Sequence, residues 1–146
     1  MKVRLAAAHD FEAVIALLEE LGRPQVTEET RDGCLAMFER HLRDGSAAHL
    51  VAEDEAGLVV GFCSLHFRDR LNYSTPEAWV PDLIVTESAR RRGAGRALLA
   101  EAERQARERG CWLLSLESAH HRTEAHAFYR AFGMTDAAKA FTKLLG

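Results

Sequence analysis

The chain has 146 residues, 47% of them hydrophobic and 28% charged, and a formal net charge of −3 at pH 7. These values are typical of one globular domain, here residues 1–146, with a sizeable core. A pI near 6.2 argues against broad binding to nucleic acid or to a membrane surface, and no apolar run approaches the roughly 20 residues that span a bilayer. Three scattered cysteines form no C-x-x-C pair, so neither a disulfide framework nor a zinc site is indicated and a cytoplasmic location is expected.

The first half of the chain predicts a short strand and two amphipathic helices. Residues 3–5 predict the strand, and apolar residues at helical spacing then run from Asp10, a candidate N-cap, to Gly22. A second helix is predicted from Thr27, followed by two glutamates that suit the positive end of the helix dipole, to near Gly45.

The second half alternates strands with helices. The β-rich runs AHLVAED and LVVGFCSLHF, joined by a short turn, predict a hairpin. Pro81 interrupts the next predicted strand, AWVPDLIV, and indicates a bulge, an edge or a splayed strand there because proline donates no ladder hydrogen bond. The remaining predictions are a helix from Gly93 to Arg109, a buried strand CWLLSLES, a helix TEAHAFYRAFG and a last strand AFTKLL.

This order predicts a mixed α/β (α+β) fold with a largely antiparallel central sheet flanked by helices. The crossover through the long helix predicts a parallel pair of strands.

The stretch ARRRGAGRALL, residues 89–99, lies where a predicted strand turns into a helix. Backbone N–H groups at a helix N-terminus bind phosphates readily, and Gly93 and Gly95 would let the backbone approach a bulky ligand. Neither a GxxxxGK[ST] loop nor G-x-G-x-x-G is present, since Leu98 stands at the third glycine's place. The alternatives are a tight turn whose arginines face water, or a nucleic-acid patch.

Two motifs carry a resemblance to a known family. LIVTESARRRGAGRALL resembles the acyl-CoA motif [R/Q]-x-x-G-x-[G/A] of the GNAT superfamily of N-acetyltransferases, with Arg90, Gly93 and Gly95 at the matching positions. RTEAHAFYRAFGM resembles the superfamily's second signature, through Ala125, Phe128, Tyr129, Gly133 and Met134. The order of elements is also similar, so the resemblance covers essentially the whole chain.

The resemblance implies acetyl-CoA as cosubstrate. In the family, the backbone of the arginine–glycine loop holds the CoA pyrophosphate, and the end of the preceding strand pairs with the pantetheine arm where that strand splays from the next. The residues implied for the loop are Arg90, Arg91, Arg92, Gly93, Ala94, Gly95 and Arg96, and those for the strand end are Leu83, Ile84 and Val85. Phe128 is expected beside the cofactor, as is Arg122, which replaces an asparagine of many relatives.

The resemblance also implies catalytic roles. Tyr129 matches the tyrosine usually assigned as the acid that protonates the leaving thiolate, although its spacing alone would equally suit an aromatic core pair with Phe128. Many relatives carry Glu-Asp where this chain has Pro81 and Asp82, so Asp82 is expected as the base or amine-binding carboxylate. Glu117 and a chain of waters are the alternatives.

The acceptor is expected to be a primary amine of a small molecule or a protein, contacting the first two helices and the loop from Arg68 to Glu77. Direct transfer in a ternary complex is expected, because no cysteine has a setting that demands an acyl-enzyme. A non-catalytic acyl-CoA-binding module is the alternative, and nucleic acid is not expected as a partner. His120 and His121 are not expected to bind metal and His126 is expected to be structural. A homodimer is expected, with the predicted last strand AFTKLL as an edge available for pairing.

Overall fold

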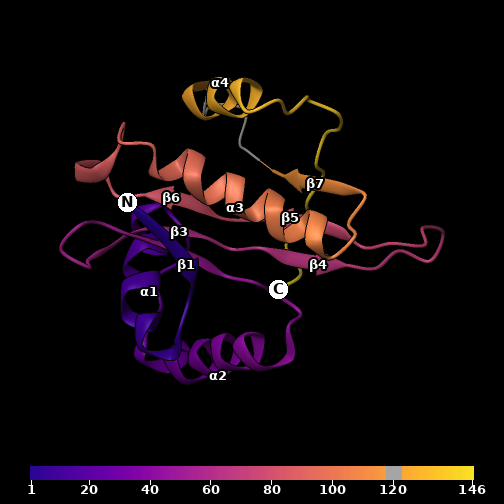
Figure 1. Cartoon of the computed structure of the whole chain (residues 1–146). Helices are drawn as coiled ribbons and strands as arrows, with labels where there is room; N and C mark the ends of the chain where they lie inside the picture. Colours follow the sequence, from indigo (N-terminus) through magenta and orange to yellow (C-terminus); the bar gives the residue numbers. More distant parts are fainter. Residues whose placement is uncertain (118–122) are drawn as a thin grey trace. The chain divides into compact units, whose positions relative to one another are not determined.

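The structure, a computed structural model, describes residues 1–117 and 123–146. Two compact units, Met1–Ser115 and Leu116–Gly146, divide the chain (Figure 1), and the single domain expected from the length stays a prediction. No helix among the described residues is long and apolar enough to cross a membrane. The elements are β1 (Lys2–Leu5), η1 (Ala8–Asp10), α1 (Phe11–Glu20), α2 (Glu28–Asp44), β2 (Leu50–Glu53), β3 (Val59–Cys63), β4 (His66–Arg68), β5 (Glu77–Val80), β6 (Leu83–Val85), η2 (Glu87–Ala89), α3 (Ala94–Glu108), β7 (Leu113–Leu116) and α4 (Thr123–Ala131).

One sheet has the strand order β1-β2-β3-β6, and each neighbouring pair in it is antiparallel. The predicted hairpin is confirmed as β2 and β3, with Leu50 opposite Cys63. In its turn, the Asp54 carboxylate accepts the N–H groups of Ala56 and Leu58, both at 2.9 Å. A side chain that satisfies turn amides in this way explains why the short polar segment connects the two strands.

A second sheet has the order β4-β5-β7, because both long apolar runs change sheets midway. The predicted strand AWVPDLIV is therefore two strands, β5 and β6, and LVVGFCSLHF is also two, β3 and β4. The two breaks meet: the Ser64 N–H donates to the Asp82 carbonyl and the Asp82 N–H donates to Ser64 Oγ, both at 2.9 Å. The interruption predicted at Pro81 is confirmed.

The strands on either side of α3 end different sheets. β6 is last in the first sheet and β7 is last in the second, so the predicted crossover pair is splayed, as the resemblance implied, rather than joined in one ladder. β7 was expected to be buried, but Leu113 is 39% exposed because the strand lies at the end of its sheet's order.

Local capping signals place the helices close to their predicted bounds. Before α2, Thr30 Oγ1 accepts the Thr27 N–H at 2.9 Å, and Gly45 ends that helix at φ 70°. Gly93 is the N-cap of α3 rather than its first residue. Asp10 does not cap α1 with its side chain; its carboxylate accepts the Ala7 N–H at 2.7 Å and pairs with Arg4, which lowers the pKa of Asp10.

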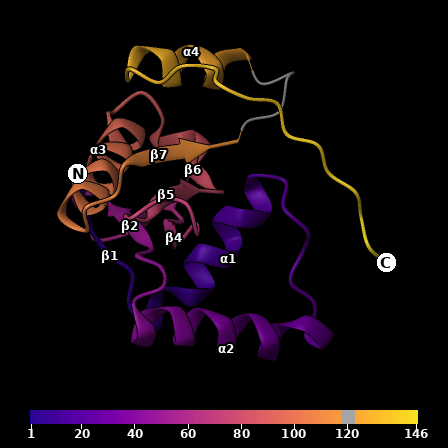
Figure 2. The same ribbon diagram turned by 90° about the vertical axis from the view of Figure 1, so that its right-hand side faces the viewer.

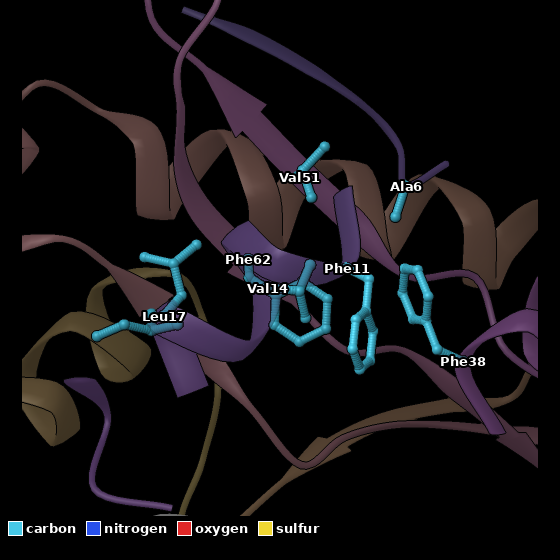
Figure 3. Close-up of a cluster of buried hydrophobic side chains, with 8 residues drawn as sticks. Ala6, Phe11, Val14, Leu17, Phe38, Val51 and Phe62 are labelled. Carbon is cyan, nitrogen blue, oxygen red and sulfur yellow. The ribbon is translucent and has the colours of Figure 1, made fainter. Parts of the chain in front are cut away.

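Helices α1 and α3 cover opposite faces of the first sheet (Figures 1 and 2). On one face, Phe11, Val14 and Leu17 of α1 pack with Val51 and Phe62 of the sheet, and Phe38 of α2 joins them (Figure 3). On the other face, Leu98 of α3 is fully buried over Gly61. Burial of each large apolar side chain contributes about 1.5–3 kcal/mol, and this two-sided core fixes the position of β6.

The second unit contains α4, which confirms the helix predicted over TEAHAFYRAFG. The prediction of a last strand over AFTKLL is wrong, since residues 135–146 form neither helix nor strand. Phe141, Leu144 and Leu145 are each more than nine-tenths exposed. A strand needs a neighbouring backbone to pair with, and the structure shows no such pairing for these residues.

Candidate functional site

Strand β6 offers a backbone edge. Its Leu83, Ile84 and Val85 pair with Cys63, Phe62 and Gly61 of β3, and β6 stands last in its sheet within the described part of the chain. The Ile84 side chain is 6% exposed, so the core holds the strand in place. An extended ligand arm can therefore pair with this edge as an added strand would, which is the role that the resemblance implies for these residues.

The loop that follows β6 has an unusual backbone. Arg91 has φ 66°, the only positive value for a residue other than glycine among those described, and Gly93 has φ 86°. Such left-handed residues turn successive N–H groups toward one side and form anion-binding concavities. The loop leads into the N-terminus of α3 at Ala94, where the helix dipole also favours negative charge. Arg91 and Arg92 are exposed beside it. This geometry fits a diphosphate.

The Arg90 side chain makes two contacts with the rest of the protein. Its Nε donates to the Val85 carbonyl at 2.9 Å, and its guanidinium lies 3.5 Å from the Glu20 carboxylate. Glu20 in turn accepts the Thr86 hydroxyl at 2.7 Å and the Glu87 N–H at 3.0 Å. Arg90 and Glu20 thus tie the loop and the end of β6 to α1, and a shallow hollow of about 600 Å³ opens at these residues. These contacts hold the loop's shape, and the cofactor-binding role expected for Arg90 stays a prediction.

Asp82 lies at the break between β5 and β6, with its carboxylate 19% exposed. One carboxylate oxygen accepts the Ser64 hydroxyl at 2.9 Å, and the other accepts Arg23 Nε at 2.7 Å. Another nitrogen of Arg23 donates to the Pro81 carbonyl at 2.9 Å. Sequence reasoning singled out Asp82 but not these partners, because Arg23 is 59 residues away in the chain.

Strand β5 and its neighbours carry a second charged group. Glu77 is buried at 6% exposure and pairs with Arg68 at 3.0 Å and Arg70 at 3.9 Å. The Arg68 guanidinium also lies 4.6 Å from the centre of the Trp79 ring. Trp79 thus packs against a charged side chain, and Trp112 stacks on Tyr73 with ring centres 4.3 Å apart.

Three histidines that sequence reasoning missed form a cluster: His41 of α2, His49 before β2 and His66 of β4. His41 Nδ1 lies 2.9 Å from His49 Nε2, and the His66 ring centre is 5.3 Å from both other rings. Burial, with the charges of the other two rings, lowers the pKa of His49 to about 4, and burial lowers that of His66. Their spacing along the chain gave no signal, since three different elements bring them together.

Tyr129 and Phe128 lie on α4 in the second unit, half-buried, with ring centres 5.5 Å apart. The Tyr129 carbonyl accepts the Met134 N–H at 3.0 Å, which folds the GM signature back onto the helix end. The acid role of Tyr129 stays a prediction. His126 is half-buried and Glu117 is exposed, whereas Arg122, His120 and His121 lie outside the described residues.

Two of the three cysteines, Cys63 and Cys111, do not suit covalent catalysis. Cys63 is fully buried, and burial raises its thiol pKa to about 12. Burial also raises the pKa of Cys111. The thiolate is the nucleophilic form, so neither thiol is poised to accept an acyl group. Across residues 1–117 and 123–146, no group of three or more His, Cys, Asp or Glu side chains is arranged to hold a metal ion.

Comparison with known proteins places these features in context. Residues 11–134 match the acetyltransferase (GNAT) family. The aminoalkylphosphonate N-acetyltransferase of Salmonella typhimurium is 32% identical over 99% of this chain and 91% of its own length. The aminoglycoside N(6')-acetyltransferase type 1 of Stenotrophomonas maltophilia is 32% identical over 72% of this chain and 71% of its own. The structure of AAC(6')-Iy with the bisubstrate analogue CoA-S-monomethyl-acetylneamine shares the fold, with a TM-score of 0.84, 22% identity and coverage of 99% and 97% of the two chains.

Proposed function

The chain belongs to the acetyltransferase (GNAT) family and is an acetyl-CoA-dependent N-acetyltransferase, and on that premise we propose that it transfers the acetyl group directly to a primary amine of a small molecule in a ternary complex. The observation that carries this proposal is the open edge of β6 running into a loop with left-handed residues at the start of α3. The edge would pair with the pantetheine arm, and the loop would hold the diphosphate.

The reaction requires the amine nitrogen to lose two protons, one before and one after it attacks, and the leaving thiolate to gain one. An alkylammonium has a pKa near 10.4, so it must lose a proton before its nitrogen attacks the thioester carbonyl. In the proposed reaction Asp82 binds the ammonium and takes the proton, directly or through water. The N–C bond forms, the C–S bond breaks, and the phenol of Tyr129 protonates the departing thiolate. The nitrogen loses its second proton to solvent, the proton on Asp82 is also released to solvent, and solvent reprotonates the phenolate of Tyr129, so one proton is released per acetyl group transferred. A backbone N–H at the strand break polarises the carbonyl.

The small-molecule acceptor is supported by the relatives, which are named for acetylating aminoalkylphosphonates and aminoglycosides. Direct transfer is supported by the high pKa of the buried Cys63 and by AAC(6')-Iy, which binds CoA and an acceptor joined in one molecule. A cytoplasmic location and a homodimer stay predictions from the sequence.

Calorimetric titration with acetyl-CoA tests the cosubstrate site. Gly93→Ala places a side chain at φ 86°, and Gly57→Ala does the same at φ 82° in the distant hairpin turn, with nothing within 4 Å of either new Cβ. Both variants are expected to lose about 1–2 kcal/mol of stability. Only Gly93→Ala is expected to weaken acetyl-CoA binding, by about tenfold or more, because it displaces the N–H groups around the diphosphate.

Equal affinity of the two glycine variants for acetyl-CoA would refute the loop assignment. Release of free CoA on addition of a panel of amines then tests turnover. Binding of acetyl-CoA without CoA release from any amine would favour the non-catalytic acyl-CoA-binding module. Intersecting lines in initial-rate plots are expected for a ternary complex, whereas parallel lines would contradict direct transfer.

A further inference from the structure

An arginine already occupies the carboxylate proposed to bind the acceptor amine. Arg23 follows the C-terminal end of α1, where its N–H donates to the Leu18 carbonyl at 3.0 Å and Gly22 adopts φ 95°. From this turn its side chain reaches the break between β5 and β6. There it donates to the Asp82 carboxylate at 2.7 Å and to the Pro81 carbonyl at 2.9 Å.

The two partners of Asp82 differ in how firmly they are held. Ser64 is 2% exposed, and its hydroxyl both donates to the Asp82 carboxylate and accepts the Asp82 N–H. The Arg23 side chain is 45% exposed and lies on the opposite carboxylate oxygen. Ser64 therefore orients the carboxylate from inside the fold, and Arg23 covers its solvent side.

An acceptor ammonium that reaches Asp82 must come within a few ångströms of the Arg23 guanidinium. For an amine with no other charge, or with further amines, this approach is opposed by like-charge repulsion. An acceptor that also carries an anion avoids the penalty, because the anion pairs with Arg23 while the ammonium pairs with Asp82. A guanidinium has five N–H donors in a fork that matches phosphonate and carboxylate groups, and the bonds to Asp82 and Pro81 use only two of its nitrogens.

Arginines also pair with Glu77, the carboxylate at the start of β5, and would oppose the approach of a further cation there. Glu77 is paired with both Arg68 and Arg70. A polycationic acceptor would have to displace arginines from Asp82 and from Glu77, whereas a zwitterionic acceptor can keep Arg23 in place.

We propose that the acceptor is a short amine bearing a phosphonate, phosphate or carboxylate group a few bonds from its nitrogen, and that Arg23 is the residue that selects it. The short spacing follows from the direct contact between Arg23 and Asp82, because charges that face two touching side chains must themselves be close together. This inference rests on the proposed function, and among the acceptors named for relatives it favours the anionic class over the aminoglycosides.

Acetylation kinetics with four amines of similar size test the proposal: aminoethylphosphonate, β-alanine, propylamine and diaminopropane. The full chain is expected to show a kcat/KM about tenfold or more higher for one or both anionic amines than for propylamine and diaminopropane, the range expected for a charge-assisted hydrogen bond. The first two amines distinguish a phosphonate from a carboxylate as the preferred anion.

Three variants of Arg23 separate charge from structure. Arg23→Ala is expected to abolish the preference for anionic amines and to leave the KM of acetyl-CoA unchanged. Arg23→Lys is expected to retain part of the preference, and Arg23→Glu to reverse it toward diaminopropane. Arg107→Ala is the control, because Arg107 is also exposed and pairs with Glu103 within α3, a helix for which no acceptor contact is expected. It is expected to keep the full preference.

Failure of this inference is distinguishable from failure of the proposed function. Turnover of propylamine or diaminopropane at least as efficient as that of the anionic amines, or an unchanged preference in Arg23→Ala, would overturn the role of Arg23 while leaving the acetyltransferase reaction intact. CoA release with none of the four amines would overturn this acceptor class. Absence of acetyl-CoA binding in the titration above would overturn the cosubstrate site itself.

Discussion

Acidification is expected to destabilise the fold through His49, which packs between α2 and the strands. The ring is 7% exposed, its centre is 6.1 Å from that of Phe38 and 5.7 Å from that of Phe62, and its Nδ1 has no hydrogen-bond partner in the described structure. Its titratable and charged neighbours are His41, His66 and the more distant Asp82. A proton on this ring would place a positive charge among apolar and histidine side chains.

The size of the effect follows from the pKa of His49, which burial and the neighbouring histidines lower from 6.5 to about 4. The unfolded chain takes up the proton near pH 6.5 and the folded chain only near pH 4, so the stability contributed by the neutral ring is complete above pH 6.5 and is lost between these values. At 1.36 kcal/mol per pKa unit the whole interval corresponds to about 3 kcal/mol, of which about 2 kcal/mol is lost by about pH 5.

Urea denaturation followed by far-ultraviolet circular dichroism at about pH 7.5 and about pH 5 measures this loss. His49→Gln removes the titration and keeps an amide that can bond His41, so its free energy of unfolding is expected to fall less over the same interval. His9→Gln is the matched control, since His9 is 76% exposed, and it is expected to behave like the unaltered chain. An equal acid-induced loss in His49→Gln and the unaltered chain would refute the argument.

Three further substitutions test the packing of two glycines and the role of Tyr129. A Cβ at Gly61 would lie 3.0 Å from Leu98 Cδ1 and 3.4 Å from the Ile84 carbonyl, so Gly61→Ala is expected to lower the free energy of unfolding by about 1–3 kcal/mol. In α2, a Cβ at Gly33 meets no atom within 4 Å. Gly33→Ala is therefore expected to raise the free energy of unfolding by up to about 1 kcal/mol in the same denaturation assay. Tyr129→Phe is expected to lower kcat by about a hundredfold, with the KM of acetyl-CoA unchanged; an unchanged kcat would show that its phenol does not protonate the thiolate.

The features that the sequence predicted well depend on local chemistry. The bounds of α2 follow from Thr27 and from Gly45, which adopts the left-handed conformation that glycine favours. The turn of the hairpin follows from Asp54 and its bonds to nearby N–H groups. Pro81 predicted an interruption of the strand because proline itself has no backbone N–H to donate. Each of these signals acts over a few residues, so spacing along the chain reveals it.

The features that were missed depend on long-range contacts. No local pattern predicts that the chain changes sheets at Ser64, because its partner Asp82 lies in the break between β5 and β6, 18 residues further along. The last strand was predicted from residue types alone, but a strand exists only where another backbone pairs with it, and the structure shows no such pairing for residues 140–145. The histidine cluster likewise joins α2, the residue before β2, and β4.

Asp82 shows most clearly what the family resemblance predicts and what only the structure adds. The resemblance identified the position because an acidic residue is common there in the family, and it fixed neither the partners nor the exposure of the carboxylate. The structure adds that Ser64 holds one oxygen from within the core and Arg23 covers the other from the surface. A family motif can therefore indicate the chemistry of acetyl transfer, while the choice of acceptor depends on a contact between α1's end and a strand break that only folding creates. For that reason the acceptor class is inferred from the Arg23–Asp82 pair rather than from either motif.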